Sequence, residues 1–275
     1  MKTEKPLMRV FFVMCCLLVL SIYPLTAEAQ QQFTESVEMP DGILLATEVW
    51  LPDGPGPFPT VLIRTPYGRE NIDEADYLAE GYAVVAQDER GFGDSQGSWY
   101  FWEHEPSDGH ATIEWIALQS WSNGKVGMIG RSALARAQYA VAQNAPSALK
   151  CLAPAHETPN RYHHAGFPGG ALFHDLVVGF MTGNNLLHLL PDLLAHRLLD
   201  SWWDGLNWVA SPETIDVPMF HMGRWYDLFH PGAPHAFQVI QHQGGALWNP
   251  NDSYLNQNDP PAKRCFFNWR SKNPS

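Results

Sequence analysis

Hydrophobic and polar positions alternate in two neighbouring stretches that follow the first thirty or so residues of this chain. Polar and apolar residues alternate over residues 34–39 and again over residues 43–51, and Pro40-Asp41-Gly42 stands between the two stretches. Alternation with a period of two on both sides of such a turn sequence is typical of a β-hairpin. The proline-rich segment 52–59 that follows predicts a loop.

The middle of the chain follows a different pattern, in which continuous apolar runs alternate with helix-like stretches. Runs of this kind suit strands that are buried on both faces of a sheet. They occupy residues 60–63, 82–86, 126–129, 149–153 and 217–222, and the helix-like stretches occupy residues 73–80, 108–119 and 133–143. This alternation predicts an α/β fold with a mostly parallel sheet flanked by helices. In such sheets the chemistry gathers at the carboxyl ends of the strands.

Residues 156–212 interrupt the alternation. The segment is rich in Leu, His and Trp and contains helical runs such as LLHLLPDLLAHRLLDSWW. An insertion of this length between two strands predicts a helical cap over the strand ends. Further helices that flank the sheet are the alternative interpretation.

The first residues have the pattern of a targeting segment. Lys2, Lys5 and Arg9 form a basic leader, residues 10–23 form an apolar run, and Ala27-Glu28-Ala29 provides a small-residue cleavage site. Residues 1–29 are therefore predicted to be a secretory signal peptide, which places the mature protein outside the cell or in the periplasm. An uncleaved membrane anchor is the alternative. A single domain is expected over residues 30–245.

Composition narrows the range of partners. The net charge of −12 disfavours nucleic acid and anionic membranes. Cys151 and Cys265 remain after cleavage, and export permits a disulfide between them, although the apolar run around Cys151 favours a buried thiol. The twelve histidines do not form a tight ligand cluster with carboxylates or cysteines, so no metal or other cofactor is expected.

The segment WSNGKVGMIGRSALA carries the strongest indication of chemistry. A short apolar strand leads into Gly130-Arg131-Ser132, and a helix-forming run follows directly. This order is the layout of a nucleophile elbow, a sharp turn that exposes a serine hydroxyl at the positive end of the next helix. The pattern departs from the usual G-x-S-x-G because Leu134 stands where the second glycine belongs.

Five sequence blocks occur in a fixed order around this elbow. They are the turn at residues 40–42, RTPYG at 64–68, GYAVVAQDERGFGDSQG at 81–97, DGHATIEWIALQSWSNGKVGMIGRS at 108–132 and VPMFHMGRWYDLF at 217–229. Together they strongly resemble the cocaine esterase and X-Pro dipeptidyl-peptidase-like hydrolases, over about residues 35–245. The resemblance implies an α/β-hydrolase fold and acyl transfer through a Ser-Asp-His triad.

The resemblance also implies roles for individual residues. Ser132 matches the nucleophile and Asp227 matches the triad acid. The Tyr67 hydroxyl and the backbone N–H of Ala133 match the two donors of the oxyanion hole. Asp88, Arg90 and Asp94 lie in the loop that follows the apolar run 82–86. We interpret them as hydrogen-bonding residues that fix this loop, and not as catalytic groups.

The triad histidine departs from the family pattern. The only histidines that follow Asp227 are His230, His235 and His242, and none lies in the expected loop beyond a further strand. His242 is the least unsuitable candidate for the base. Residues 246–275 form an irregular tail, which is rich in Asn and Pro and lacks the C-terminal β-sandwich of the family, so the chain resembles a truncated member.

We therefore expect a secreted serine hydrolase that cleaves a small-molecule ester, an amide or a short peptide through an acyl-enzyme on Ser132. A catalytically inactive remnant or binding protein of the same fold, lacking the triad histidine, is the first alternative. A metal-dependent binding protein is the second.

Overall fold

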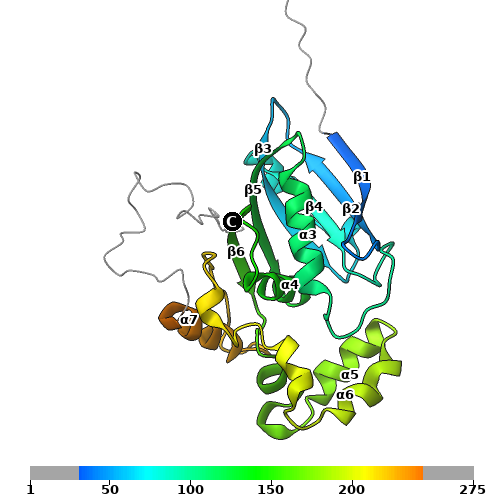
Figure 1. Cartoon of the computed structure of the whole chain (residues 1–275), viewed down its shortest axis with the longest axis vertical. Helices are drawn as coiled ribbons and strands as arrows, with labels where there is room; N and C mark the ends of the chain where they lie inside the picture. Colours follow the sequence, from blue (N-terminus) through cyan, green and yellow to red (C-terminus); the bar gives the residue numbers. More distant parts are fainter. Residues whose placement is uncertain (1–30, 244–275) are drawn as a thin grey trace, which may run out of the picture.

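The β-hairpin at the start of the chain is present as predicted. The computed structural model describes residues 31–243, apart from the side chains of 241–243 (Figure 1). Strands β1 (Gln31–Glu38) and β2 (Leu44–Leu51) pair antiparallel, with Val37 opposite Leu45. Gly42 adopts a positive φ of 82° in the turn between them, a conformation that glycine tolerates best.

The hairpin forms the edge of a six-stranded sheet with the order β1-β2-β4-β3-β5-β6. Its four central and distal strands run parallel to one another, as the continuous apolar runs predicted. They are β3 (Phe58–Thr65), β4 (Ala83–Asp88), β5 (Ser122–Arg131) and β6 (Leu149–Ala155). Because these four strands are parallel, their carboxyl ends meet at one edge of the sheet. The fold is that of an α/β-hydrolase, as the sequence predicted.

Helices cover both faces of the sheet and explain why β4 is apolar throughout. Val85 faces the large core that includes residues of α3 (Glu105–Ala117) and α4 (Ala133–Ala142). Its neighbours Val84 and Ala86 point to the opposite face, where Trp50 and residues of α2 (Ala75–Ala79) cover them. Because successive strand residues point to opposite faces, a strand covered on both sides must be apolar at every position.

The predicted strand at residues 217–222 lies parallel to β6 but forms only two isolated bridges, Leu152↔Met219 and Ala155↔Met222. Backbone bonds from Phe220 N to Leu152 O (2.8 Å) and from Met222 N to Pro154 O (3.0 Å) flank the gap. Pro154 lacks the N–H that would bond between them, so the ladder is interrupted in its middle.

Residues 156–212, for which a helical cap was predicted, form short helices connected by irregular turns. The α-helices among them are α5 (His174–Gly183) and α6 (Leu190–Ala195), and both lie beyond the end of the sheet (Figure 1). The 3-10 and π helices of residues 31–243 are η1 (Arg69–Asn71), η2 (Tyr162–Gly166), η3 (Pro168–Gly170), η4 (Leu187–Leu189), η5 (Ser201–Leu206) and η6 (Pro212–Thr214). Helix α7 (Gly232–Gln243) closes the described part of the chain.

The predicted signal peptide, the irregular tail and Cys265 lie outside the described residues. Cys151 is half-buried in β6. Within residues 31–243, none of the helices is both long enough and apolar enough to cross a bilayer.

Candidate active site

Ser132 lies at the sharp turn between β5 and α4. Its backbone adopts φ 57° and ψ −126°, a strained conformation that L-residues rarely occupy. The Ser132 N–H donates to Ala155 O at 2.9 Å, while Ser132 O accepts from Ala135 N (2.9 Å) and Arg136 N (3.1 Å). Among the side chains that the structure describes, those of residues 31–240, the Ser132 hydroxyl has no hydrogen-bond partner. Strain of this kind is found at functional sites, and here it presents an uncommitted hydroxyl at a helix N-terminus.

Leu134, the departure from the usual elbow pattern, packs against Gly130. Gly130 has φ 149°, and a Cβ built on it would overlap Leu134 Cβ. Gly130 is therefore the residue that leaves room for Leu134 in this elbow. Buried Gln138 adds further support, because its amide donates to Leu134 O (3.2 Å) and accepts from Ala153 N (2.8 Å).

Tyr67 and Ala133 are the two predicted oxyanion donors. Tyr67 follows β3, is 47% exposed, and lines the same cavity as Ser132. Its backbone is fixed by bonds from Tyr67 N to Thr65 Oγ1 (3.0 Å) and from Asn71 Nδ2 to Tyr67 O (2.8 Å). Ala133 is the first residue of α4, so its N–H has no acceptor within the helix.

Asp227, the predicted triad acid, contacts a histidine that the sequence analysis did not identify. The Asp227 carboxylate forms a short hydrogen bond with Nδ1 of His156, and its other oxygen accepts from Phe229 N at 2.8 Å. His156 directly follows β6 and has a positive φ of 53°. A backbone bond from His156 N to Met222 O (2.9 Å) holds it beside the segment that leads to Asp227.

His242, the histidine proposed from the sequence, lies in α7, and its side chain is outside the described residues. His156 was missed because it precedes Asp227 in the chain, whereas the family pattern places the base after the acid. Its position directly after a buried parallel strand was the available signal.

The three residues at the end of the second parallel strand complete their bonds within the protein. Asp88 pairs with Arg69 (2.5 Å), and the same arginine reaches Asp94 (2.9 Å). Arg90 forms a two-pronged pair with Asp108 (2.9 and 2.7 Å). Each side chain thus fixes a loop, the role expected from the sequence.

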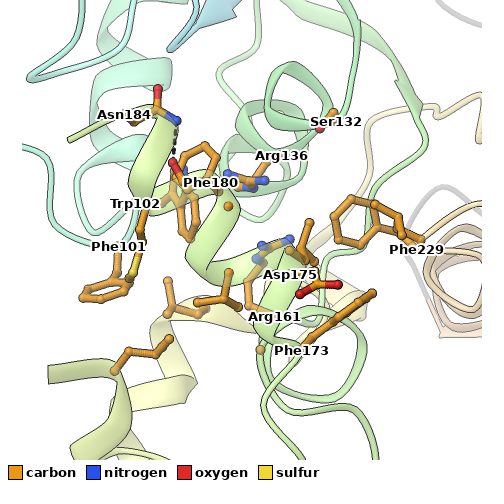
Figure 2. A pocket seen from close by; sticks show the side chains of 18 of the residues that line it. Phe101, Trp102, Ser132, Arg136, Arg161, Phe173, Asp175, Phe180, Asn184 and Phe229 are labelled. Carbon is orange, nitrogen blue, oxygen red and sulfur yellow. Dashed lines mark hydrogen bonds between the residues drawn. The ribbon is translucent and has the colours of Figure 1, made fainter. Parts of the chain in front are cut away.

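A cavity of about 570 Å³ opens beside Ser132 (Figure 2). Side chains of the 156–212 segment form much of its wall, together with aromatic residues that follow β4 and residues that follow Asp227. The aromatic lining residues are Tyr67, Trp99, Phe101, Trp102, Phe173, Phe180, Trp203 and Phe229. The charged lining residues are Arg136, Arg161 and Asp175. Such a cavity can accept an apolar group of a small molecule next to the serine.

Some of the twelve histidines lie near one another. The rings of His164 and His235 lie 5.1 Å apart, and burial, together with the neighbouring His235, His163 and His230, lowers the pKa of His164 to about 4. In the described part of the chain, however, no group of three or more potential ligands is arranged to hold a metal ion.

Comparison with known families gives one match that spans more than half of the chain. Residues 41–189 match the family described as X-Pro dipeptidyl-peptidase (S15 family). This region contains Tyr67, Ser132 and Ala133, whereas Asp227 follows it.

Individual relatives agree with that match. The chain is 34% identical over 162 residues to cocaine esterase of Rhodococcus sp. (strain MB1 Bresler), a match that covers 55% of this chain and 28% of the relative. A solved CocE/NonD family hydrolase from Staphylococcus aureus superposes with a TM-score of 0.70 at 25% identity, covering 79% of this chain and 44% of the other. An α-amino acid ester hydrolase has a TM-score of 0.66 at 21% identity, covering 81% and 48% of the two chains. The match thus spans little more than a quarter of that cocaine esterase.

Proposed function

Because this chain belongs to the X-Pro dipeptidyl-peptidase (S15) family, we propose that it is a serine hydrolase that cleaves an acyl ester or amide through an acyl-enzyme on Ser132. The observation that carries this proposal is the strained backbone of Ser132 at the start of α4, beside a cavity and with its hydroxyl not hydrogen-bonded to any side chain of residues 31–240. A serine in this position needs a base and an oxyanion site to react.

The proposed reaction has two steps. Ser132 Oγ attacks the substrate carbonyl while a histidine accepts the hydroxyl proton, and the Tyr67 hydroxyl and Ala133 N–H donate to the resulting oxyanion. The leaving alcohol or amine takes the proton from the histidine as the acyl-enzyme forms. Water then attacks the acyl-enzyme with the same histidine as base, which releases the acid and restores Ser132.

We assign the base to His156, in place of His242. His156 contacts Asp227, which can hold its ring and stabilise the imidazolium. Ser132 N donates to the carbonyl oxygen of Ala155, the residue directly before His156. The backbones of Ser132 and His156 therefore lie close together, at the carboxyl ends of the adjacent strands β5 and β6.

A fluorophosphonate probe tests the nucleophile. The purified protein should be labelled on Ser132, and labelling should disappear in Ser132→Ala while circular dichroism shows an unchanged fold. Labelling that persists in Ser132→Ala would contradict the assignment. Probe binding at another serine would be identified by mass spectrometry of the labelled peptide.

A binding protein of the same fold that lacks turnover is the second candidate. It is favoured by the absence, among the side chains of residues 31–240, of a hydrogen bond between the Ser132 hydroxyl and a histidine. This candidate predicts a folded protein that binds ester analogues but neither reacts with the probe nor releases nitrophenol from nitrophenyl esters.

We also propose that the protein is exported, on the basis of the basic leader, apolar run and cleavage sequence in residues 1–29. Expression of the full chain in a bacterium, fractionation and N-terminal sequencing would test this. A mature protein beginning near Gln30 outside the cytoplasm is expected, whereas a cytoplasmic protein that keeps Met1 would contradict export.

A further inference from the structure

Two buried arginines share one carboxylate in the wall of the cavity beside Ser132. Arg136 lies one helical turn after Ser132 in α4 and donates to Glu157 Oε2 from Nε (3.2 Å) and Nη2 (2.8 Å). Arg161 donates from Nη1 to Glu157 Oε1 at 2.5 Å. The exposed fractions are only 3% for Arg136, 7% for Arg161 and 1% for Glu157.

Each arginine keeps a donor without an acceptor. Arg136 Nη1 and Arg161 Nε are both buried and have no hydrogen-bond partner among the residues that the structure describes. Figure 2 shows both guanidinium groups among the side chains that line the cavity. Buried polar groups in folded proteins nearly always have a partner, so two unpartnered donors in one cavity wall indicate a place for an acceptor from a ligand.

Charges near the arginines leave the wall positive. The guanidinium of Arg136 stacks on Trp102, with its carbon 4.0 Å from the ring centre, which supports the cation but does not neutralise it. Burial, with the nearby Glu105, raises the pKa of Glu89 well above its usual value and favours its neutral form. Asp175 lines the cavity with a side chain that is 98% exposed, so water screens its charge.

Arg161 is protonated at neutral pH. Burial lowers its pKa to about 10, with Arg136 contributing in the same direction and Glu157 opposing it. Two positive groups thus share one carboxylate, that of Glu157, and both line a cavity whose other lining residues are mostly apolar.

We propose that Arg136 and Arg161 form a subsite for a carboxylate carried by the acyl part of the substrate. This proposal rests on the proposed function at Ser132 and specifies its substrate class, an acyl group with an apolar chain or ring that ends in a negative charge. The two unpartnered N–H donors, one from each guanidinium, suit a carboxylate because each of its two oxygens can accept a charge-assisted hydrogen bond. A substrate with a free amino group in the same place would be disfavoured by like charge.

Binding to a protein that cannot turn over tests the subsite without relying on catalysis. In Ser132→Ala, isothermal titration calorimetry would compare 4-phenylbutyrate with the neutral 4-phenylbutyramide. Charge-assisted hydrogen bonds are strong, so we expect the carboxylate to bind about tenfold or more tightly than the amide. Equal affinity for the two compounds would overturn the proposal.

Arg161→Gln is the informative variant, because Glu157 keeps its pair with Arg136 when Arg161 is neutralised. In the Ser132→Ala background it should reduce the affinity for 4-phenylbutyrate to that for the amide and leave amide binding unchanged. Arg197→Gln, the same change at an exposed arginine outside the cavity, is the control and should leave both affinities unchanged. If Arg161→Gln fails to fold, Arg161→Lys serves instead. It keeps the charge but removes the Nε donor, and an unaltered preference for the carboxylate would contradict the subsite.

A matched pair of esters separates failure of the subsite from failure of the proposed function. The mono-4-nitrophenyl ester of glutaric acid ends in a carboxylate, whereas its methyl ester carries a neutral methoxycarbonyl group at the same position. Preferential release of nitrophenol from the charged ester, lost in Arg161→Gln, supports both proposals. Equal release from both esters overturns the subsite and leaves the serine hydrolase standing. Carboxylate-selective binding without any release leaves the subsite standing and overturns the hydrolase.

Discussion

The loop after β4 and the elbow after β5 lie at the same edge of the sheet but are held in opposite ways. In the loop, Asp88 and Arg90 satisfy their charges with partners inside the protein, and Asp108, the partner of Arg90, is fully buried. At the elbow, the backbone of Ser132 is strained, and its hydroxyl has no hydrogen-bond partner among the side chains of residues 31–240. Polar side chains that are fully hydrogen-bonded within the protein stabilise this edge of the sheet, whereas a polar side chain without such a partner is available to a substrate.

The largest expected effect is on the elbow side, where the base decides the rate. His156→Gln should reduce the rate of probe labelling and of ester hydrolysis at least a thousandfold, because triad members act as a unit. His242→Gln should retain nearly the full rate. The rates of the two variants would be compared by quenching the fluorophosphonate labelling reaction at a series of times, and circular dichroism would confirm folding. The opposite ranking would return the base to His242, the histidine proposed from the sequence.

The largest effect on the loop side is on stability. Arg90→Met would leave Asp108 buried without its two-pronged partner, and breaking a buried pair in this way costs about 3–5 kcal/mol of the free energy of unfolding. Urea denaturation would measure the loss. Arg197→Met, at an exposed arginine, is the control and should change little. Asp108→Asn should recover part of the loss in the Arg90→Met background, and a double variant no better than Arg90→Met would show that the pair is not the cause.

The oxyanion site should respond through rate and not through stability. Tyr67→Phe removes one donor, and loss of one oxyanion donor typically costs about 3 kcal/mol of transition-state stabilisation, or roughly a hundredfold in kcat. Because Tyr67 is 47% exposed, the melting temperature of the Tyr67→Phe protein should change little. A loss confined to KM would indicate that the hydroxyl binds the ground state and is not an oxyanion donor.

The elbow itself can be tested through the contact between Gly130 and Leu134. Gly130→Ala places a Cβ against Leu134 Cβ at φ 149°, which should destabilise the protein by about 1–3 kcal/mol. Leu134→Gly in the same background removes the opposing atom and should recover part of that loss, although glycine in a helix costs about 1 kcal/mol. Urea midpoints of the four proteins in this cycle would give the coupling. Additive effects would show that the two residues do not compete for space.

The sequence predicted those parts of the fold that depend on local patterns. Pro40-Asp41-Gly42 indicated the hairpin, and the apolar runs indicated strands covered on both faces. The G-R-S triplet between an apolar strand and a helix indicated the elbow. The interrupted ladder beside β6 was not predicted, although Pro154 explains it once the pairing is known.

What the sequence did not predict depends on contacts between separate elements. His156 meets Asp227 across 71 positions of the chain, and the role proposed for it departs from the usual order of the triad. Arg136 and Arg161 meet Glu157 only when α4 and the segment after β6 pack together. Neither arrangement has a periodicity or a fixed spacing, so only the three-dimensional structure brings these residues together.

The smallest effect concerns a histidine behind the elbow and its dependence on pH. Burial lowers the pKa of His221 from 6.5 to about 4, and its Nδ1 lies 2.9 Å from the Tyr139 hydroxyl. A histidine whose pKa is lower in the folded state contributes its full stability above the unfolded pKa. That stability is lost as the pH falls from about 6.5 toward 4, because the unfolded state takes up the proton first.

His221→Gln should therefore reduce the loss of unfolding free energy over this pH range by about 1–2 kcal/mol. The expected effect is of this modest size because His221 is only half-buried. Urea denaturation at intervals between pH 7 and pH 4 would measure it, with His174→Gln, at a mostly exposed histidine, as the control. Parallel pH profiles of the wild type and His221→Gln would show that acid sensitivity arises elsewhere, with half-buried His164 as the next group to replace.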